Sequence, residues 1–88
     1  MVMQYATLTV KNYSGLHARP ASQLIELSNK YASSIIIKHN EIEADTKSII
    51  SLLSAGIKQG TVIELAVEGA DEKEAIEAVS NLINNLEG

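Results

Sequence analysis

The segment Gly15-Leu-His-Ala-Arg-Pro-Ala21 decides how the chain is built, because it closes a loop and opens a helix. Pro20 is the only proline. It suits the first turn of a helix, where its missing N–H would have had no intrahelical partner. Apolar residues then recur at helical spacing between Leu24 and Tyr31. The pattern predicts a helix from about Ala18 to Lys30, after a loop that starts at Asn12.

Strand patterns lie on both sides of this segment. Upstream, Ala6–Val10 alternates apolar with polar residues, which is typical of a strand with one buried face. Downstream, Ser34–Lys38 and Ile42–Asp45 flank a turn at Asn40-Glu41 and predict a β-hairpin. Thr61–Glu68 alternates again and predicts a fourth strand.

Two more helices follow from capping signals. Ser48 is a preferred N-cap residue before a short apolar segment, and Gly56 is well placed to end that helix. Asp71, followed three residues later by Glu74, resembles a capping box, and the apolar face behind it extends to Leu86. The predicted order is βαββαβα. It favours a single α+β domain over residues 1–88, with a four-stranded, largely antiparallel sheet covered on one face by helices.

Composition excludes several classes of function. The formal net charge is −4 and the only aromatic residues are three tyrosines, so a basic, stacking surface for nucleic acid is missing. Cysteine is absent, and two histidines do not complete a typical zinc site, so we expect no metal and no cofactor. No apolar run is long enough to cross a membrane and no signal peptide is apparent, so we expect no membrane insertion.

The chemistry is predicted at His17, just before the first helix. The first amides of a helix lack internal acceptors and carry the positive end of its dipole, so they can hold phosphate oxygens. Arg19 can add a charge-assisted hydrogen bond. Gly15 can adopt a positive φ that turns the loop sharply and presents the ring outward. We therefore expect His17 to be a nucleophile for a phosphoryl group.

Through Gly15-Leu-His-Ala-Arg-Pro-Ala21 and Lys47-Ser-Ile49, the sequence resembles HPr, the histidine-containing phosphocarrier of the bacterial sugar phosphotransferase system. The resemblance covers essentially the whole chain. It implies an open-faced β-sandwich and a phosphoryl relay in which enzyme I donates to His17 and sugar-specific EIIA domains receive. Arg19 would stabilise the phosphate, with Ala18 and Pro20 shaping the site. The protein would be a cytoplasmic monomer and a carrier rather than a stand-alone enzyme.

The resemblance also implies regulation at Ser48. In HPr proteins of many Gram-positive bacteria, the serine in such a context is phosphorylated by HPr kinase/phosphorylase, and a catabolite-control transcription factor then becomes a partner. A purely structural role as an N-cap is the other interpretation of Ser48. The apolar residues of the short helix span a wide arc, so either all of them belong to the core or some form an exposed patch. The resemblance implies that such a patch docks enzyme I. The predicted docking residues are Leu16, Lys47, Ile49, Ile50 and Leu53.

Two alternatives remain at this point. The chain could be a regulatory paralogue that acts mainly through Ser48 phosphorylation and transcription-factor binding, although it retains His17. It could also be a small ligand-binding or assembly domain with the same periodicities and no transferred group. His39, in the predicted hairpin turn, is expected to be exposed and structural.

Overall fold

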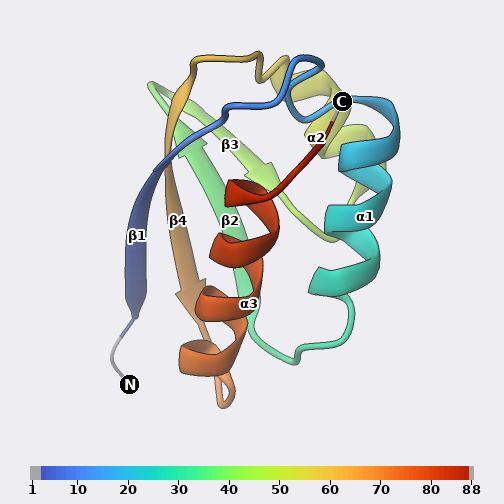
Figure 1. The fold of residues 1–88 in the computed structure, drawn as a ribbon. Coiled ribbons are helices and arrows are strands. Elements are labelled where there is room, and N and C mark those ends of the chain that lie inside the picture. The colour runs from blue at the N-terminus through green and yellow to red at the C-terminus, as the bar shows by residue number, and fades with distance from the viewer. Residues whose placement is uncertain (1–2, 88) are drawn as a thin grey trace.

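A four-stranded antiparallel sheet forms one layer of the molecule and three helices form the other (Figure 1). The computed structural model describes residues 3–87. The strands are β1 (Gln4–Thr9), β2 (Ser34–His39), β3 (Ile42–Asp45) and β4 (Val62–Glu68), in the spatial order β1-β4-β2-β3. The helices are α1 (Ala18–Ser28), α2 (Ile49–Ala55) and α3 (Glu72–Asn84). The predicted fold and element order are confirmed.

Strand β4 holds the sheet together, because it pairs with β1 on one side and with β2 on the other. Its register sets Val67 opposite Ile35 and Leu65 opposite Ile37, and all four side chains are buried. Val62, Glu64 and Glu68 alternate with the inward-facing residues of β4 and are exposed on the other face, while Ala66, between Leu65 and Val67, is buried. This alternation leaves one face of the sheet for the helices and the other face uncovered.

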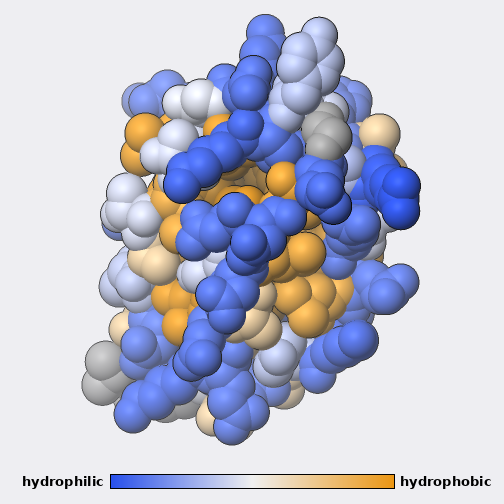
Figure 2. Space-filling model, viewed as in Figure 1, coloured by the Kyte–Doolittle hydropathy of each residue, from blue (hydrophilic) through white to orange (hydrophobic). Residues whose placement is uncertain are grey.

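The core lies between this sheet and the helices. In Figure 1, α1 and α3 lie on the same side of the sheet, while α2 contacts α1 and β3. Each helix contributes fully buried apolar residues, among them Leu24 of α1, Leu52 of α2 and Val79 of α3. Figure 2 shows mostly hydrophilic side chains on the outside of this face, with apolar atoms visible between them. Within residues 3–87, no helix combines the length and apolar character that crossing a membrane requires.

The ends of α1 and α2 follow local chemistry. Ser48 caps α2 as predicted, since its Oγ accepts a hydrogen bond from the Ser51 amide at 3.2 Å. Gly56 ends the same helix in the left-handed conformation, with φ of 63°. Helix α1 ends at Ser28 rather than near Lys30. Its C-cap residue, Asn29, donates a side-chain hydrogen bond to the carbonyl of Ile25 at 2.9 Å.

The predicted capping box at the start of α3 is wrong. Asp71 occupies the N-cap position, but its side chain makes no hydrogen bond to the helix. Its carboxylate instead accepts hydrogen bonds from the hydroxyl and amide of Ser33 and from the amide of Ala32. These bonds, the Ser33 hydroxyl first, lower the pKa of Asp71 below its usual value. The carboxylate thus joins the loop before β2 to the start of α3.

His39 also differs from expectation. It is the last residue of β2, paired with Ile42, and it is half-buried rather than exposed. The turn itself begins at Asn40, whose φ is 56°. The Asn40 side-chain amide lies 3.3 Å from His39 Nε2. Nothing else bonds to the ring within the described residues, so His39 remains a structural residue of the hairpin.

Candidate functional site

His17 occupies the N-cap position of α1 with its side chain exposed. Its backbone is extended, with φ of −123° and ψ of 161°, which is the usual geometry of an N-cap residue. Its side chain makes no capping hydrogen bond. The ring therefore stands at the start of the helix without being used to stabilise it, as the sequence predicted.

The amides that follow His17 are available to an anion. Within residues 3–87, the N–H groups of Ala18 and Arg19 donate to no acceptor, and Pro20 has none to donate. No acidic residue lies in the first turn of α1, so nothing there neutralises the positive end of the helix dipole. Ala18 has a positive φ of 47°, which is uncommon for a residue with a Cβ. Unpaired donors and dipole together favour a phosphate beside the ring.

Gly15 allows the loop to approach the chain that leads into β4. Its φ is 64°, and a Cβ at this position would overlap the carbonyl oxygen of Ile57 and come within 2.8 Å of Lys58 Cα. The next amide, that of Leu16, donates to the same Ile57 oxygen at 3.0 Å. Only glycine combines this φ with this clearance. The sharp turn predicted at Gly15 is confirmed.

Leu16 was predicted to contact partners, and for its side chain that prediction is wrong. Only 1% of Leu16 is exposed, and it belongs to the hydrophobic core. An apolar side chain between a sharp glycine turn and an exposed histidine gains more by entering the core than by staying in solvent. Leu16 anchors the loop from below, while His17 projects from it.

Asn12 is a residue of this site that the sequence interpretation missed. Its side chain is 7% exposed, and its Nδ2 donates to the carbonyl of Gly15 at 2.7 Å. Its own carbonyl accepts the Gly15 amide at 3.1 Å. An asparagine three residues before a glycine is a signal for such a turn, since asparagine side chains readily hydrogen-bond nearby backbone.

Arg19 lines a shallow depression beside the start of α1. The segment that follows α3 forms the other side of this depression, and Figure 1 shows this segment running to the start of α1. Its remaining lining comes from Ser14, Ala18, Pro20, Gln23, Asn85 and Glu87. Arg19 is exposed, so its guanidinium is free to reach an anion held at the helix start.

The predicted docking residues of α2 are largely at the surface. Ile50 is 75% exposed, while Ile49 and Leu53 are about two-fifths exposed, at 41% and 37%. Leu52 is fully buried, so one side chain of the arc anchors the helix and three form an apolar patch. Lys47 is half-buried and its Nζ donates to the carbonyl of Tyr31 at 2.7 Å. Figure 1 places α2 at the same end of the molecule as the His17 loop.

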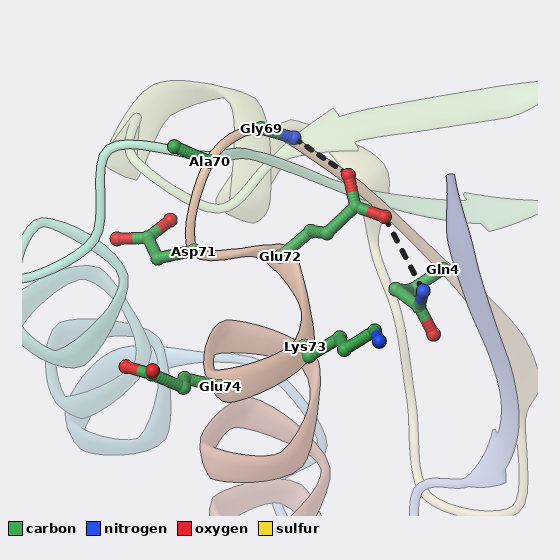
Figure 3. A pocket seen from close by; sticks show the side chains of 7 residues that line it. All are labelled: Gln4, Gly69, Ala70, Asp71, Glu72, Lys73 and Glu74. Atoms are coloured by element: carbon green, nitrogen blue, oxygen red, sulfur yellow. Dashed lines mark hydrogen bonds between the residues drawn. The ribbon is translucent and has the colours of Figure 1, made fainter. Parts of the chain in front are cut away.

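A larger depression lies around the start of α3, and the side chains of Gln4, Asp71 and Glu72 in its lining make hydrogen bonds within the protein (Figure 3). The Glu72 carboxylate accepts from the Gly69 amide at 3.1 Å and from Gln4 Nε2 at 3.3 Å. Asp71 turns toward Ser33, as described above. Nowhere in residues 3–87 do three or more acidic or histidine side chains gather as metal ligands.

Comparison with known proteins agrees with this geometry. The family model described as the HPr component phosphorylation site of the phosphotransferase system matches residues 5–85. The chain belongs to the HPr family of phosphocarriers. The match decides between an HPr-type carrier and an unrelated ligand-binding domain in favour of the carrier.

Individual relatives cover nearly the whole chain. Phosphocarrier protein HPr of Lysinibacillus sphaericus is 39% identical over 84 residues, which are 96% of each chain. Phosphocarrier protein NPr of Proteus mirabilis is also 39% identical, over 93% of this chain and 92% of that one. The crystal structure of HPr-C-His from Thermoanaerobacter tengcongensis superposes with a TM-score of 0.89 at 40% identity, covering 92% and 91%. HPr and NPr relatives are thus equally similar in sequence.

Proposed function

We propose that the protein accepts a phosphoryl group on His17 from phosphorylated enzyme I and passes it to EIIA domains of sugar transporters. The observation that carries this proposal is an exposed, unbonded imidazole at the N-cap of α1, followed by two amides with no acceptor in residues 3–87. A carrier needs such openness, because its phosphorus atom must be reached by donor and acceptor in turn.

The transfer step needs no co-reactant. The lone pair of a neutral His17 ring nitrogen forms a new bond to phosphorus, and the bond between phosphorus and the donor atom breaks with its electron pair. The amides of Ala18 and Arg19 and the guanidinium of Arg19 are placed to hold the phosphoryl oxygens during transfer. The onward step to an acceptor is the same exchange in reverse.

The exposed apolar patch of α2 supports the same proposal, because it offers a surface on which enzyme I can dock. Ile49, Ile50 and Leu53 would pack against enzyme I, and Lys47 would contribute at the margin. Burying exposed apolar area at about 25 cal/mol per Å² favours association without help from His17 itself. A short-lived complex of modest area suits a carrier that must leave each partner.

Phosphorylation assays test the proposed function. Incubated with enzyme I and phosphoenolpyruvate, the protein should gain one phosphate that is labile in acid and stable in base. His17→Ala should gain none, while the control His39→Ala, which alters the only other histidine, should be labelled like the native protein. Labelling of His17→Ala, or no labelling of the native protein, would contradict the proposal.

Ser48 is proposed as a second, regulatory phosphorylation site for HPr kinase/phosphorylase. Ser48 is half-buried beside the apolar patch, so a phosphate there would place negative charge next to Ile49. We expect this charge to weaken docking of enzyme I and to create a site for a catabolite-control transcription factor. HPr kinase and ATP should give an acid-stable phosphate that Ser48→Ala lacks, whereas labelling of nearby Ser51 would contradict the assignment.

A regulatory paralogue is the second candidate function, and similarity to Crh, the catabolite repression HPr of Bacillus subtilis, supports it, with 29% identity and a TM-score of 0.75. Such a protein would gain phosphate at Ser48 but transfer none from His17 to an EIIA domain. We also propose that the carrier is cytoplasmic and monomeric, because its partners must approach one face in turn. Gel filtration at micromolar concentration checks the monomer.

A further inference from the structure

The peptide unit between Gly15 and Leu16 is held on both sides. Its carbonyl accepts from Asn12 Nδ2 at 2.7 Å, and its N–H donates to the carbonyl of Ile57 at 3.0 Å. The Gly15 amide is bonded as well, to the Asn12 carbonyl at 3.1 Å. His17 begins one residue beyond this peptide. Its backbone position therefore depends on how firmly the Gly15 carbonyl is fixed.

Asn12 is the only side chain that supplies such a bond. Between Tyr13 and Arg19, no other side chain in residues 3–87 hydrogen-bonds the backbone. The remaining constraints are the backbone bonds above and the burial of Leu16. Because His17 and Arg19 are exposed, their surroundings do not fix them, and the loop beneath must do so.

Burying the Asn12 side-chain oxygen, Oδ1, reduces the stability of the fold. Its Oδ1 is buried and has no hydrogen-bond partner in residues 3–87. A buried polar atom without a partner destabilises a fold, and such atoms call for an explanation. Here the explanation is the Nδ2 group, whose donor function no apolar side chain could replace.

We infer that Asn12 is a positioning residue for phosphoryl transfer, which sets the His17 ring relative to the amides of Ala18 and Arg19. This inference rests on the proposed function. Because Asn12 is buried, we expect its side chain to act on the transfer step and not on docking. Displacement of a reacting group by about 1 Å can slow a reaction roughly 100-fold.

The test measures single-turnover transfer from phosphorylated enzyme I to His17 as a function of carrier concentration. For Asn12→Ala we expect the maximal rate constant to fall about 10- to 100-fold while the half-saturating concentration stays unchanged. Ser33→Ala is the matched control. It removes a hydrogen bond of a fully buried side chain in the loop between α1 and β2, a loop that Figure 1 shows at the opposite end of the molecule from the start of α1, and we expect native transfer from it. Denaturant unfolding confirms that each variant is folded under assay conditions.

Asn12→Asp separates positioning from folding. An ionised carboxylate of similar shape cannot donate to the Gly15 carbonyl, whereas a protonated one can. Burial at this position raises the pKa of an aspartate above its usual value of about 3.9, so protonation begins in mild acid. The rate relative to the native protein at the same pH should therefore be low at about pH 8 and rise as the pH falls through about 5. A merely structural role would not give this profile in a folded protein.

Each outcome decides the inference. It is overturned if Asn12→Ala transfers less than about fivefold more slowly than Ser33→Ala, if the loss lies in half-saturation alone, or if Asn12→Asp shows no recovery in acid. Failure of the proposed function looks different, because the native protein would then take no phosphate on His17 at all.

Discussion

Replacing Gly15 with alanine should be far more damaging than replacing another glycine of the same backbone conformation. Gly15 and Gly56 have φ values of 64° and 63°. A Cβ on Gly56 would meet nothing within 4 Å, while one on Gly15 would overlap the carbonyl of Ile57. The two substitutions share the conformational penalty, so their difference isolates the close contact.

The magnitudes follow from these two effects. An alanine in the left-handed region costs about 1–2 kcal/mol, which is the whole effect expected for Gly56→Ala. Forcing an atom into a packed site adds about 1–3 kcal/mol, so Gly15→Ala should lose about 2–5 kcal/mol. Domains of this kind unfold with a free energy of only about 5–15 kcal/mol. At roughly 4–8 °C per kcal/mol, the melting temperature of Gly15→Ala should fall by about 8–40 °C.

Urea unfolding followed by circular dichroism measures both free energies. Folded Gly15→Ala should also accept phosphate from enzyme I more slowly, because relief of the overlap moves the peptide before His17. If Gly15→Ala proves no less stable than Gly56→Ala, the loop does not pack against the chain at Ile57 as described, and the reasoning about His17 placement fails with it.

Three further predictions concern other parts of the molecule. Because hydrogen bonds lower the pKa of Asp71, the stability they give is complete above its usual pKa and is lost as pH falls through the lowered one. Unfolding measured between about pH 5 and pH 2 should therefore show a smaller acid loss in Ser33→Ala. Ser48→Ala should lose about 1 kcal/mol of unfolding free energy with its N-cap bond, and an unchanged midpoint in urea would contradict that role. Leu52→Ala should lose about 2–5 kcal/mol, whereas Ile50→Ala should stay within about 0.5 kcal/mol and weaken binding to enzyme I, as calorimetry can measure.

Periodicity predicted the elements of this fold because each one buries a single face. Buried and exposed residues largely alternate along strands such as β4. Helix α2 begins after its N-cap residue Ser48 and ends at Gly56, which has the left-handed conformation. These signals are local, so they can be recognised in a short segment of sequence without knowing which distant residues it contacts. The segment around His17 was predictable for the same reason, since a glycine turn, a histidine and a proline mark the helix start directly.

The errors arose where a distant residue decided the outcome. Asp71 has the right spacing for a capping box, but Ser33 lies nearby only in the folded molecule and takes the carboxylate. Leu16 was predicted to dock partners, whereas its side chain packs into the core beneath the loop. Asn12 was predicted only as the start of the loop, with no role for its side chain. Burial, rather than residue type, distinguishes it.

Exposure of the nucleophile and rigidity of its support depend on each other in this site. A histidine that capped its own helix would be well ordered, but its ring nitrogen would be engaged and a partner could not reach it. A histidine in an unsupported loop would be reachable but poorly aligned with the amides that hold phosphate. Here the loop that carries His17 is held in place by the close packing of Gly15 against Ile57 and by the burial of Leu16 in the core. That division leaves His17 exposed on the side from which, under the proposed function, phosphorus would arrive and depart, so rigid support beneath the loop would direct the transfer.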